Sequence, residues 1–226
     1  MVSIGSCDVP AQNNTQLIPF QDWTLRVRPA EAQPTRLLLL IHGWTGDENS
    51  MWVFVRRFPA RYWIVAPRAP FSTKPNGYSW RAASAIPGAA PMLEDLRPAA
   101  SRIIGLADTF AAANGIQDLA LDAIGFSQGA ALVNTLALLY PQRLGRLGVL
   151  SGFVPAGAES LLSPHLLEGK SFFAAHGTRD DRVHVEAARK SVRALEGAGA
   201  KVTYCEDDVG HKLSAKCLHA LEAFFA

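Results

Sequence analysis

The stretch Gly125-Phe126-Ser127-Gln128-Gly129 places one serine between two glycines, directly after an apolar run and before a helix-forming one. A serine hydroxyl attacks a carbonyl carbon when a neighbouring base takes its proton, and that base needs a third group to orient it. The GxSxG pattern is typical of a nucleophile elbow, a strained strand-to-helix turn whose glycines let strand and helix approach closely. Taken alone, the same stretch also fits an ordinary turn serine in a glycine-rich chain.

An acid and a base follow Ser127 in the chain order that a nucleophile elbow requires, serine first and histidine last. Asp180 and Asp181 follow one apolar run, in AAHGTRDDRV, and His211 follows the next, in DDVGHKLS. Three separately placed groups in this order predict a catalytic triad with Ser127 as the nucleophile and His211 as the base. Either aspartate can supply the acid at this point, because capping of the next helix explains the other one.

Acyl transfer places negative charge on a carbonyl oxygen, so the site also needs two fixed N–H donors. We expect one from the backbone of Gln128, directly after the nucleophile, and the other from the backbone of Trp44 in the loop HGWTGDE. His42 in that loop and His176 are interpreted as structural residues, since one imidazole is enough for the mechanism. The spacing of His, Cys and carboxylate residues indicates no metal site.

A series of strands and helices must position these groups. Short apolar runs predict strands at residues 36–43, 62–70, 119–126, 147–153, 170–177 and 201–207. Helical spacing predicts helices at residues 92–113, 129–140, 183–196 and 217–225. Strands that alternate with helices favour an α/β fold with a mostly parallel central sheet and helices on both faces. The alternating stretch 23–30 is expected to be an antiparallel edge strand.

Length and composition narrow the class of protein. The chain of 226 residues, 49% hydrophobic and 19% charged, fits a single globular domain over 1–226, with 1–20 as an irregular N-terminal extension. The formal charge of +2 and the scattered Lys and Arg argue against nucleic acid as a partner. Residues 154–169 are too few for a separate cap domain, so we expect an open site.

The expected location is cytoplasmic, without stable membrane insertion. The longest apolar run, LLLLI, is too short to cross a bilayer, and the N-terminus has no signal-peptide pattern. Cys7, Cys205 and Cys217 have no metal-ligand spacing and are expected to be free thiols, which suits a reducing compartment.

Six segments together make the chain resemble the α/β-hydrolases of the phospholipase/carboxylesterase family, which includes acyl-protein thioesterases. They are LLIHGWTGDE, PRAP followed by YSW, GFSQGA, LSGF, HGTRDDRV and VGHKLS. The resemblance implies Ser127 as nucleophile, Asp180 as acid and His211 as base, in a lidless fold without metal or cofactor. It also implies an oxyanion hole formed by the Trp44 and Gln128 amides.

Two departures from the family pattern stand out. The loop HGWTGDE is longer than the HGLGD that is typical of the thioesterases, and Asp181 stands where proline is frequent. The resemblance also places Trp80 beside an acyl pocket, with a tryptophan that only covers the core as the alternative.

The expected activity is that of a serine carboxylesterase, acting on small-molecule esters through an acyl-enzyme on Ser127. Thioesters and lysophospholipids are further substrate classes. Four apolar residues are candidates for contact with a hydrophobic acyl or aryl group: Trp44, Phe71, Trp80 and Phe153. The alternatives are a non-catalytic binding protein, or a peptidase or carbon–carbon bond hydrolase, on the same fold. The sequence leaves open whether the protein is a monomer or a dimer.

Overall fold

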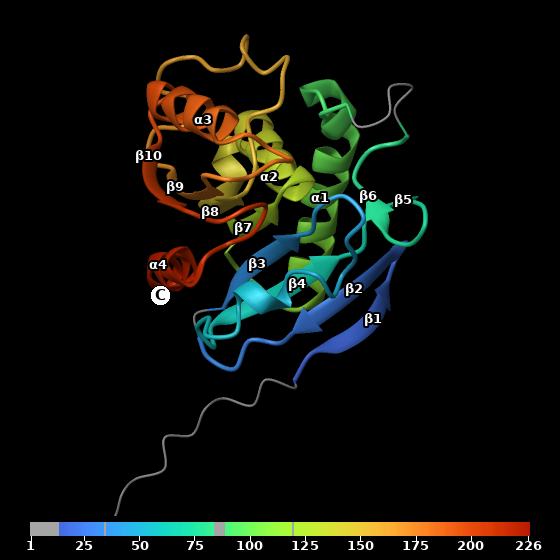
Figure 1. Ribbon diagram of the computed structural model, residues 1–226. Helices are drawn as coiled ribbons and strands as arrows, with labels where there is room; N and C mark the ends of the chain where they lie inside the picture. The colour runs from blue at the N-terminus through green and yellow to red at the C-terminus, as the bar shows by residue number, and fades with distance from the viewer. Residues whose placement is uncertain (1–13, 34, 84–88, 119) are drawn as a thin grey trace, which may run out of the picture.

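The computed structural model describes residues 14–33, 35–83, 89–118 and 120–226 (Figure 1). In these ranges eight strands form one sheet, in the order β1-β2-β4-β3-β7-β8-β9-β10. Its strands are β1 (Gln16–Phe20), β2 (Trp23–Arg28), β3 (Arg36–Ile41), β4 (Tyr62–Pro67), β7 (Leu121–Phe126), β8 (Leu144–Leu150), β9 (Ser171–Gly177) and β10 (Lys201–Asp207). A separate hairpin consists of β5 (Phe71–Ser72) and β6 (Tyr78–Ser79).

Among the described residues, three α-helices lie between strands and a fourth follows the last strand, as the sequence predicts. They are α1 (Leu93–Ala113), α2 (Gln128–Leu139), α3 (Val185–Gly197) and α4 (Ala215–Phe225), with short 3-10 turns η1 (Trp52–Phe54) and η2 (Pro141–Arg143). Neighbouring strands from β4 to β10 pair in parallel, whereas β2 is antiparallel to both β1 and β4. The predicted α/β fold with a mostly parallel sheet is therefore confirmed.

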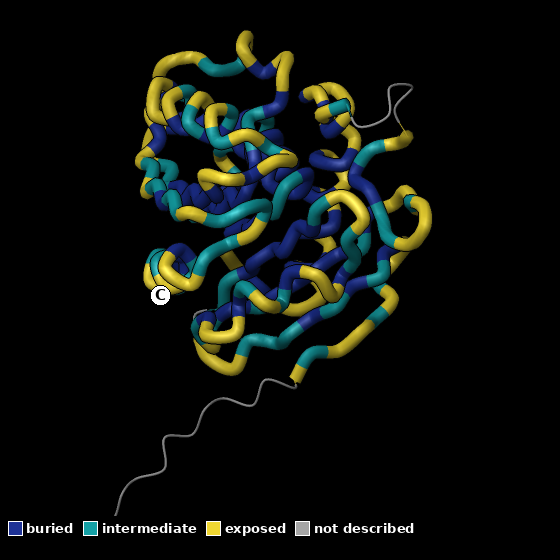
Figure 2. The backbone as a smooth tube through the Cα atoms, viewed as in Figure 1, coloured by how far each residue is buried: buried dark blue, intermediate teal, exposed yellow. Residues whose placement is uncertain are grey.

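Strand β3 shows why the sheet is covered on both faces. Leu37, Leu39 and Ile41 point into a core shared with α1 and α2, while Leu38 and Leu40 point into a second core shared with α4. Successive side chains of a strand point to opposite faces of the sheet, so a strand that is apolar at every position must be covered on both faces. Figure 2 shows the result, with buried strands inside and exposed segments around them.

Helix α2 lies against the centre of the sheet. Every residue from Gln128 to Leu138 is buried, which is what a helix that is apolar on most sides requires. It packs against β7, β8 and α1, and its first residue directly follows Ser127. The helix therefore fixes the backbone on one side of the candidate nucleophile.

The structure corrects the N-terminal prediction. Residues 16–20 form β1, which pairs with β2, so they are not an irregular extension and β2 is not the edge strand. The run QLIPF is short, is interrupted by Pro19 and leaves Leu17 exposed, features that an edge strand tolerates but that obscure the pattern. Residues 1–13 of the expected extension lie outside the described residues.

The prediction of free thiols is wrong for two of the three cysteines. Cys205 on β10 and Cys217 in the first turn of α4 form a disulfide, with Cα atoms 5.8 Å apart. Their spacing of 12 residues matches no motif, and only the packing of α4 against β10 brings them together. Cys7 lies outside the described residues.

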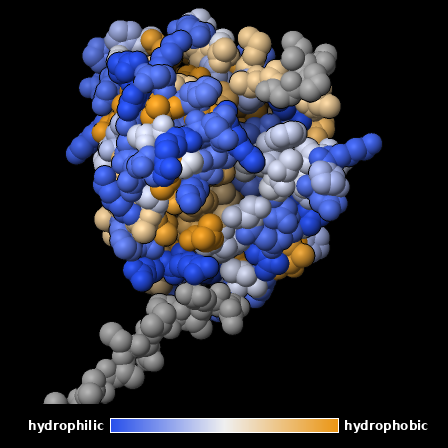
Figure 3. Space-filling model, in the orientation of Figure 1, coloured by the Kyte–Doolittle hydropathy of each residue, from blue (hydrophilic) through white to orange (hydrophobic). Residues whose placement is uncertain are grey.

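The face of the molecule seen in Figure 3 is mainly hydrophilic, with small apolar patches between charged and polar side chains. Within the described ranges, no helix combines the length and the apolar character needed to cross a membrane.

Candidate active site

Ser127 occupies a strained turn between β7 and α2. Its φ of 54° and ψ of −116° are unusual for a residue with a side chain. A Cβ on Gly125 would lie 2.2 Å from the carbonyl oxygen of Gly129, and one on Gly129 would lie 2.0 Å from the carbonyl oxygen of Ile41. Both glycines are therefore required by the close approach of strand and helix, as a nucleophile elbow demands.

The structure brings His211 and Asp180 together. Nδ1 of His211 lies 2.7 Å from Oδ2 of Asp180, in a contact where the aspartate side chain is fully buried. The other carboxylate oxygen of Asp180 accepts the backbone N–H groups of Arg182 and Val183, each at 2.9 Å. Asp181 is exposed. Of the two aspartates that the residues alone left open, Asp180 is the one that meets the histidine.

The surroundings of Asp180 keep its carboxylate charged. Burial acts to raise its pKa, but the N–H of Val183, the ring of His211 and the N–H of Arg182 outweigh burial and bring the pKa below its ordinary value. A carboxylate held in this way can orient an imidazole and stabilise its protonated form.

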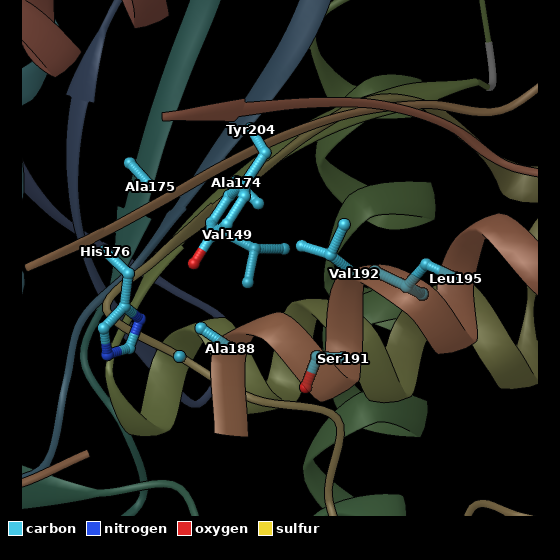
Figure 4. Close-up of a pocket in the computed structure, with 10 residues that line it drawn as sticks. Val149, Ala174, Ala175, His176, Ala188, Ser191, Val192, Leu195 and Tyr204 are labelled. Carbon is cyan, nitrogen blue, oxygen red and sulfur yellow. The ribbon is translucent and has the colours of Figure 1, made fainter. Parts of the chain in front are cut away.

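His176 on β9 also contacts this carboxylate. Its Nε2 lies 2.7 Å from the carbonyl oxygen of Val183 and 3.3 Å from Oδ2 of Asp180. Figure 4 shows His176 at one edge of a cavity between the sheet and α3. The volume of this cavity is about 10 Å³, far too small for a substrate. The role is structural, as interpreted from the sequence, but the contact with Asp180 is not something the sequence could indicate.

The ring of His211 is held on its other side by aromatic packing. Phe126, the residue before the nucleophile, lies 4.9 Å from the His211 ring, and Phe54 of η1 stacks on Phe126 at 5.9 Å, measured between centroids. A Cβ on Gly177 would lie 2.3 Å from the carbonyl oxygen of Gly210. The loop that carries the histidine is thus packed closely against the end of β9.

The loop after β3 passes beside the elbow. A Cβ on Gly43 would lie 3.3 Å from Cβ of Ser127, so the residue before Trp44 lies against the candidate nucleophile. The amide of Gln128 is the first N–H of α2. Within the described residues neither amide donates to an acceptor of the protein. Both are available to an incoming oxygen.

His42 is a brace for the same loop, as interpreted from the sequence. Its Nε2 accepts the N–H of Ala69 at 3.1 Å, so its proton is on Nδ1, which donates to the carbonyl oxygen of Gly43 at 2.8 Å. Burial lowers the pKa of His42. The ring is therefore neutral and occupied on both nitrogens.

The four residues that were expected to contact the substrate differ in how far they are exposed. Trp80 is 1% exposed and its indole donates to the carbonyl oxygen of His42, so it covers the core instead of lining a pocket. Phe153 is partly buried and packs against the main core. Trp44 and Phe71, at 60% and 44%, are exposed. For Trp80 the structure therefore favours the alternative that the sequence left open, a tryptophan that covers the core.

Metal-ligating side chains do not gather anywhere in the part of the chain that the structure covers. No three His, Cys, Asp or Glu residues there lie in an arrangement that could hold an ion.

Residues 24–226 match the family model described as Phospholipase/Carboxylesterase. The carboxylesterase SOBER1 of Arabidopsis thaliana is 37% identical over 103 residues, which cover 44% of this chain and 45% of that protein. A probable carboxylesterase of Oryza sativa subsp. japonica is 33% identical over 115 residues, which cover 50% of this chain and 43% of that protein. The matched segment thus spans less than half of these curated relatives.

Solved structures show the same fold. A carboxylesterase from Mesorhizobium loti superposes with a TM-score of 0.79 at 20% identity, covering 93% of this chain and 98% of that chain. The Bacillus cereus carboxylesterase gives a TM-score of 0.77 at 23% identity, covering 90% and 94%. The crystal structure of SOBER1 gives 0.70 at 25% identity, covering 84% and 97%. The described sheet and helices form the fold of the α/β-hydrolases.

Proposed function

Because the chain belongs to the phospholipase/carboxylesterase family, we propose that it hydrolyses carboxylic esters through an acyl-enzyme on Ser127. The observation that supports this most strongly is the 2.7 Å contact between His211 and the buried carboxylate of Asp180, in a chain whose nucleophile candidate sits on a strained elbow. An orienting acid, a base and an activated serine are the groups that acyl transfer needs.

In the proposed first step His211 takes the proton of Ser127 as Oγ attacks the ester carbonyl carbon. The contact with Asp180 engages Nδ1, so Nε2 is left as the proton acceptor. The imidazolium that forms is stabilised by the charged Asp180 and donates its proton to the leaving alcohol as the carbon–oxygen bond breaks. Water then attacks the acyl-enzyme with His211 as base, which releases the carboxylic acid and restores Ser127.

In both tetrahedral intermediates the oxyanion is proposed to accept hydrogen bonds from the backbone N–H groups of Trp44 and Gln128. Their lack of a protein acceptor within the described residues supports this role. The N-terminal end of α2 adds a favourable electrostatic field for negative charge at that position.

The proposed substrates are small esters with a hydrophobic acyl or aryl group. Trp44 follows Gly43, which lies against Ser127, and Phe71 begins the β5–β6 hairpin that bonds to the same loop. Both side chains are exposed and can cover an apolar group. Thioesters undergo the same chemistry, and lysophospholipids also carry an ester of this kind, so both are included in the proposed range.

The alternatives have less support. A binding protein on this fold would have no need for a buried carboxylate held against His211. A peptidase or a carbon–carbon bond hydrolase on this fold would use the same serine, and a substrate panel distinguishes both from an esterase.

One of the arguments for a cytoplasmic location no longer holds. It relied in part on free thiols, but Cys205 and Cys217 are bonded and buried. Disulfides persist mainly in oxidising compartments, so the pair favours such a compartment over a reducing one.

A substrate panel tests the proposed function. Esters and thioesters of graded acyl length, peptides and a carbon–carbon hydrolase substrate are incubated with the protein, and a fluorophosphonate probe is applied in parallel. We expect ester hydrolysis and labelling of the peptide that contains Ser127. Folded protein that neither hydrolyses any ester nor takes the label would contradict the proposal.

A further inference from the structure

The side chain of Gln128 is buried and bonded at both ends of its amide. It is 6% exposed, its Oε1 accepts the backbone N–H of Trp80 at 3.0 Å, and its Nε2 donates to Oγ of Ser79 at 3.1 Å. Burying an amide is unfavourable unless its hydrogen bonds are replaced, and here both are. The residue after the nucleophile therefore ties the elbow to the segment that leaves β6.

Trp80 in turn bonds to the loop that follows β3. Its indole Nε1 donates to the carbonyl oxygen of His42 at 2.7 Å, and the two rings lie 5.0 Å apart. His42 precedes Trp44 by two residues. The backbone on the N-terminal side of the Trp44 amide is thus held by a fully buried side chain.

The β5–β6 hairpin holds the other side of Trp44. Thr45 donates its N–H to the carbonyl oxygen of Tyr78 at 3.0 Å, and the N–H of Tyr78 donates to Gly46 at 2.9 Å. Gly77 has a φ of 124°, and a Cβ there would lie 2.1 Å from the carbonyl oxygen of Thr45. The hairpin and the loop are therefore in close backbone contact.

These contacts form a closed path around the two free amides. Gln128 bonds to Trp80, Trp80 bonds to His42, and the hairpin that precedes Trp80 bonds to Thr45. Trp44 lies in the chain between His42 and Thr45, so it is held on both sides. Donors of an oxyanion hole are effective when they are fixed before the charge develops. A side chain that fixes their separation acts on the rate without contacting the substrate.

We propose that Trp80 and the side chain of Gln128 are positioning residues that hold the Trp44 amide at a fixed separation from the Gln128 amide. This inference rests on the proposed function, because it concerns the oxyanion hole of that same site. It assigns Trp80 a role in the transition state even though the ring has no surface to offer a substrate.

Two conservative substitutions test the inference. Trp80→Phe removes the indole N–H, and Gln128→Met removes both side-chain hydrogen bonds while keeping the backbone amide. Tyr62→Phe is the matched control. It removes an equally buried hydrogen bond, to Asp122, near the amino ends of β4 and β7, away from the candidate site. We expect each test variant to lower kcat for an aryl ester by about tenfold, with KM nearly unchanged.

Three further readouts separate positioning from a loss of stability. Inhibition by an alkyl trifluoromethyl ketone, which is bound as a tetrahedral adduct, is expected to weaken by the same factor as kcat. The pH dependence of kcat/KM is expected to stay as in wild type, because Asp180 and His211 are untouched. The kcat of the double variant is expected to be no lower than that of the less active single variant, because both substitutions interrupt the same series of hydrogen bonds.

The outcomes distinguish this inference from the proposed function. An active wild type whose folded Trp80→Phe and Gln128→Met variants keep its kcat, or lose no more than Tyr62→Phe, overturns the inference alone. A loss confined to KM also overturns it. A folded wild type that neither hydrolyses esters nor takes a fluorophosphonate overturns the proposed function, and the inference with it.

Discussion

Nδ1 of His211 lies 2.7 Å from Oδ2 of Asp180, although 31 residues separate the two in the chain. The contact follows from the sheet, because β9 and β10 are parallel neighbours whose carboxyl ends meet at one edge. The acid lies just after the first strand and the histidine just after the second. The geometry therefore depends on the two strands staying in register.

This contact predicts unequal roles for two adjacent aspartates. Asp180→Asn is expected to lower kcat by about 10⁴-fold, because the amide favours the wrong tautomer of His211. Asp181→Asn, which changes an exposed side chain in the same turn, is the matched control and is expected to stay within about twofold of wild type. Steady-state kinetics on an aryl ester measure both. Loss of activity at 181 with retention at 180 would move the acid role to Asp181.

The elbow predicts a large difference between two glycines. Gly125→Ala places a Cβ 2.2 Å from the carbonyl oxygen of Gly129, so we expect a loss of more than about 3 kcal/mol in the free energy of unfolding, or no folded protein. Gly105→Ala, at an exposed position of α1, meets nothing within 4 Å and is expected to stabilise by about 0.5–1 kcal/mol. Urea denaturation compares them. Equal stability of the two variants would contradict the close approach inferred here.

The sequence predicted the elements whose pattern is local. The leucines of β3 and the apolar residues of α2 as far as Leu138 are buried as their spacing indicates. Ser127 and His211 were found because each follows an apolar run, and strand ends in a parallel sheet share an edge. These two residues were thus inferred from position along the chain alone, whereas the choice of Asp180 over Asp181 came from the family resemblance.

Contacts between distant side chains left no comparable signal. The bond from Trp80 to His42 joins residues 38 positions apart, and the one from Gln128 to Trp80 joins residues 48 apart. Both depend on where the β5–β6 hairpin lies, and a two-residue strand has too few positions to show alternation. The Cys205–Cys217 disulfide likewise depends on how α4 packs on β10.

The buried His42 predicts that stability falls in mild acid. Its pKa is lowered from 6.5 in the folded protein by burial, so below that pH the unfolded chain binds more protons. The free energy of unfolding is then expected to decrease as pH falls below 6.5, by up to about 1.4 kcal/mol per pH unit until the lowered pKa is reached. Above pH 6.5 this contribution is complete and constant.

Denaturation of wild type and His42→Gln across this pH range measures the effect. Glutamine does not titrate, so the variant is expected to show a smaller decrease between pH 6.5 and 5.5. Identical slopes in the two proteins would show that His42 takes up no proton on unfolding.

The disulfide predicts a stability difference that depends on a reductant. Closing a loop between Cys205 and Cys217, 12 residues apart, restricts the unfolded chain and is expected to contribute about 3 kcal/mol. The Cys205→Ala/Cys217→Ala variant should therefore melt roughly 10 °C below the oxidised wild type in calorimetry. Excess dithiothreitol should lower the Tm of wild type toward that of the variant and leave the variant unchanged. A variant that melts with oxidised wild type would rule out this contribution.

The central claim is that Ser127 forms an acyl-enzyme, and one measurement addresses it most directly. Wild type and Ser127→Ala are mixed with a p-nitrophenyl ester, and the covalent mass of each is followed with the rate of p-nitrophenol release. We predict an acyl adduct on the Ser127 peptide of wild type, and no adduct with a rate at least about 10⁴-fold lower in Ser127→Ala. A folded Ser127→Ala protein that hydrolyses the ester at the wild-type rate would contradict the account.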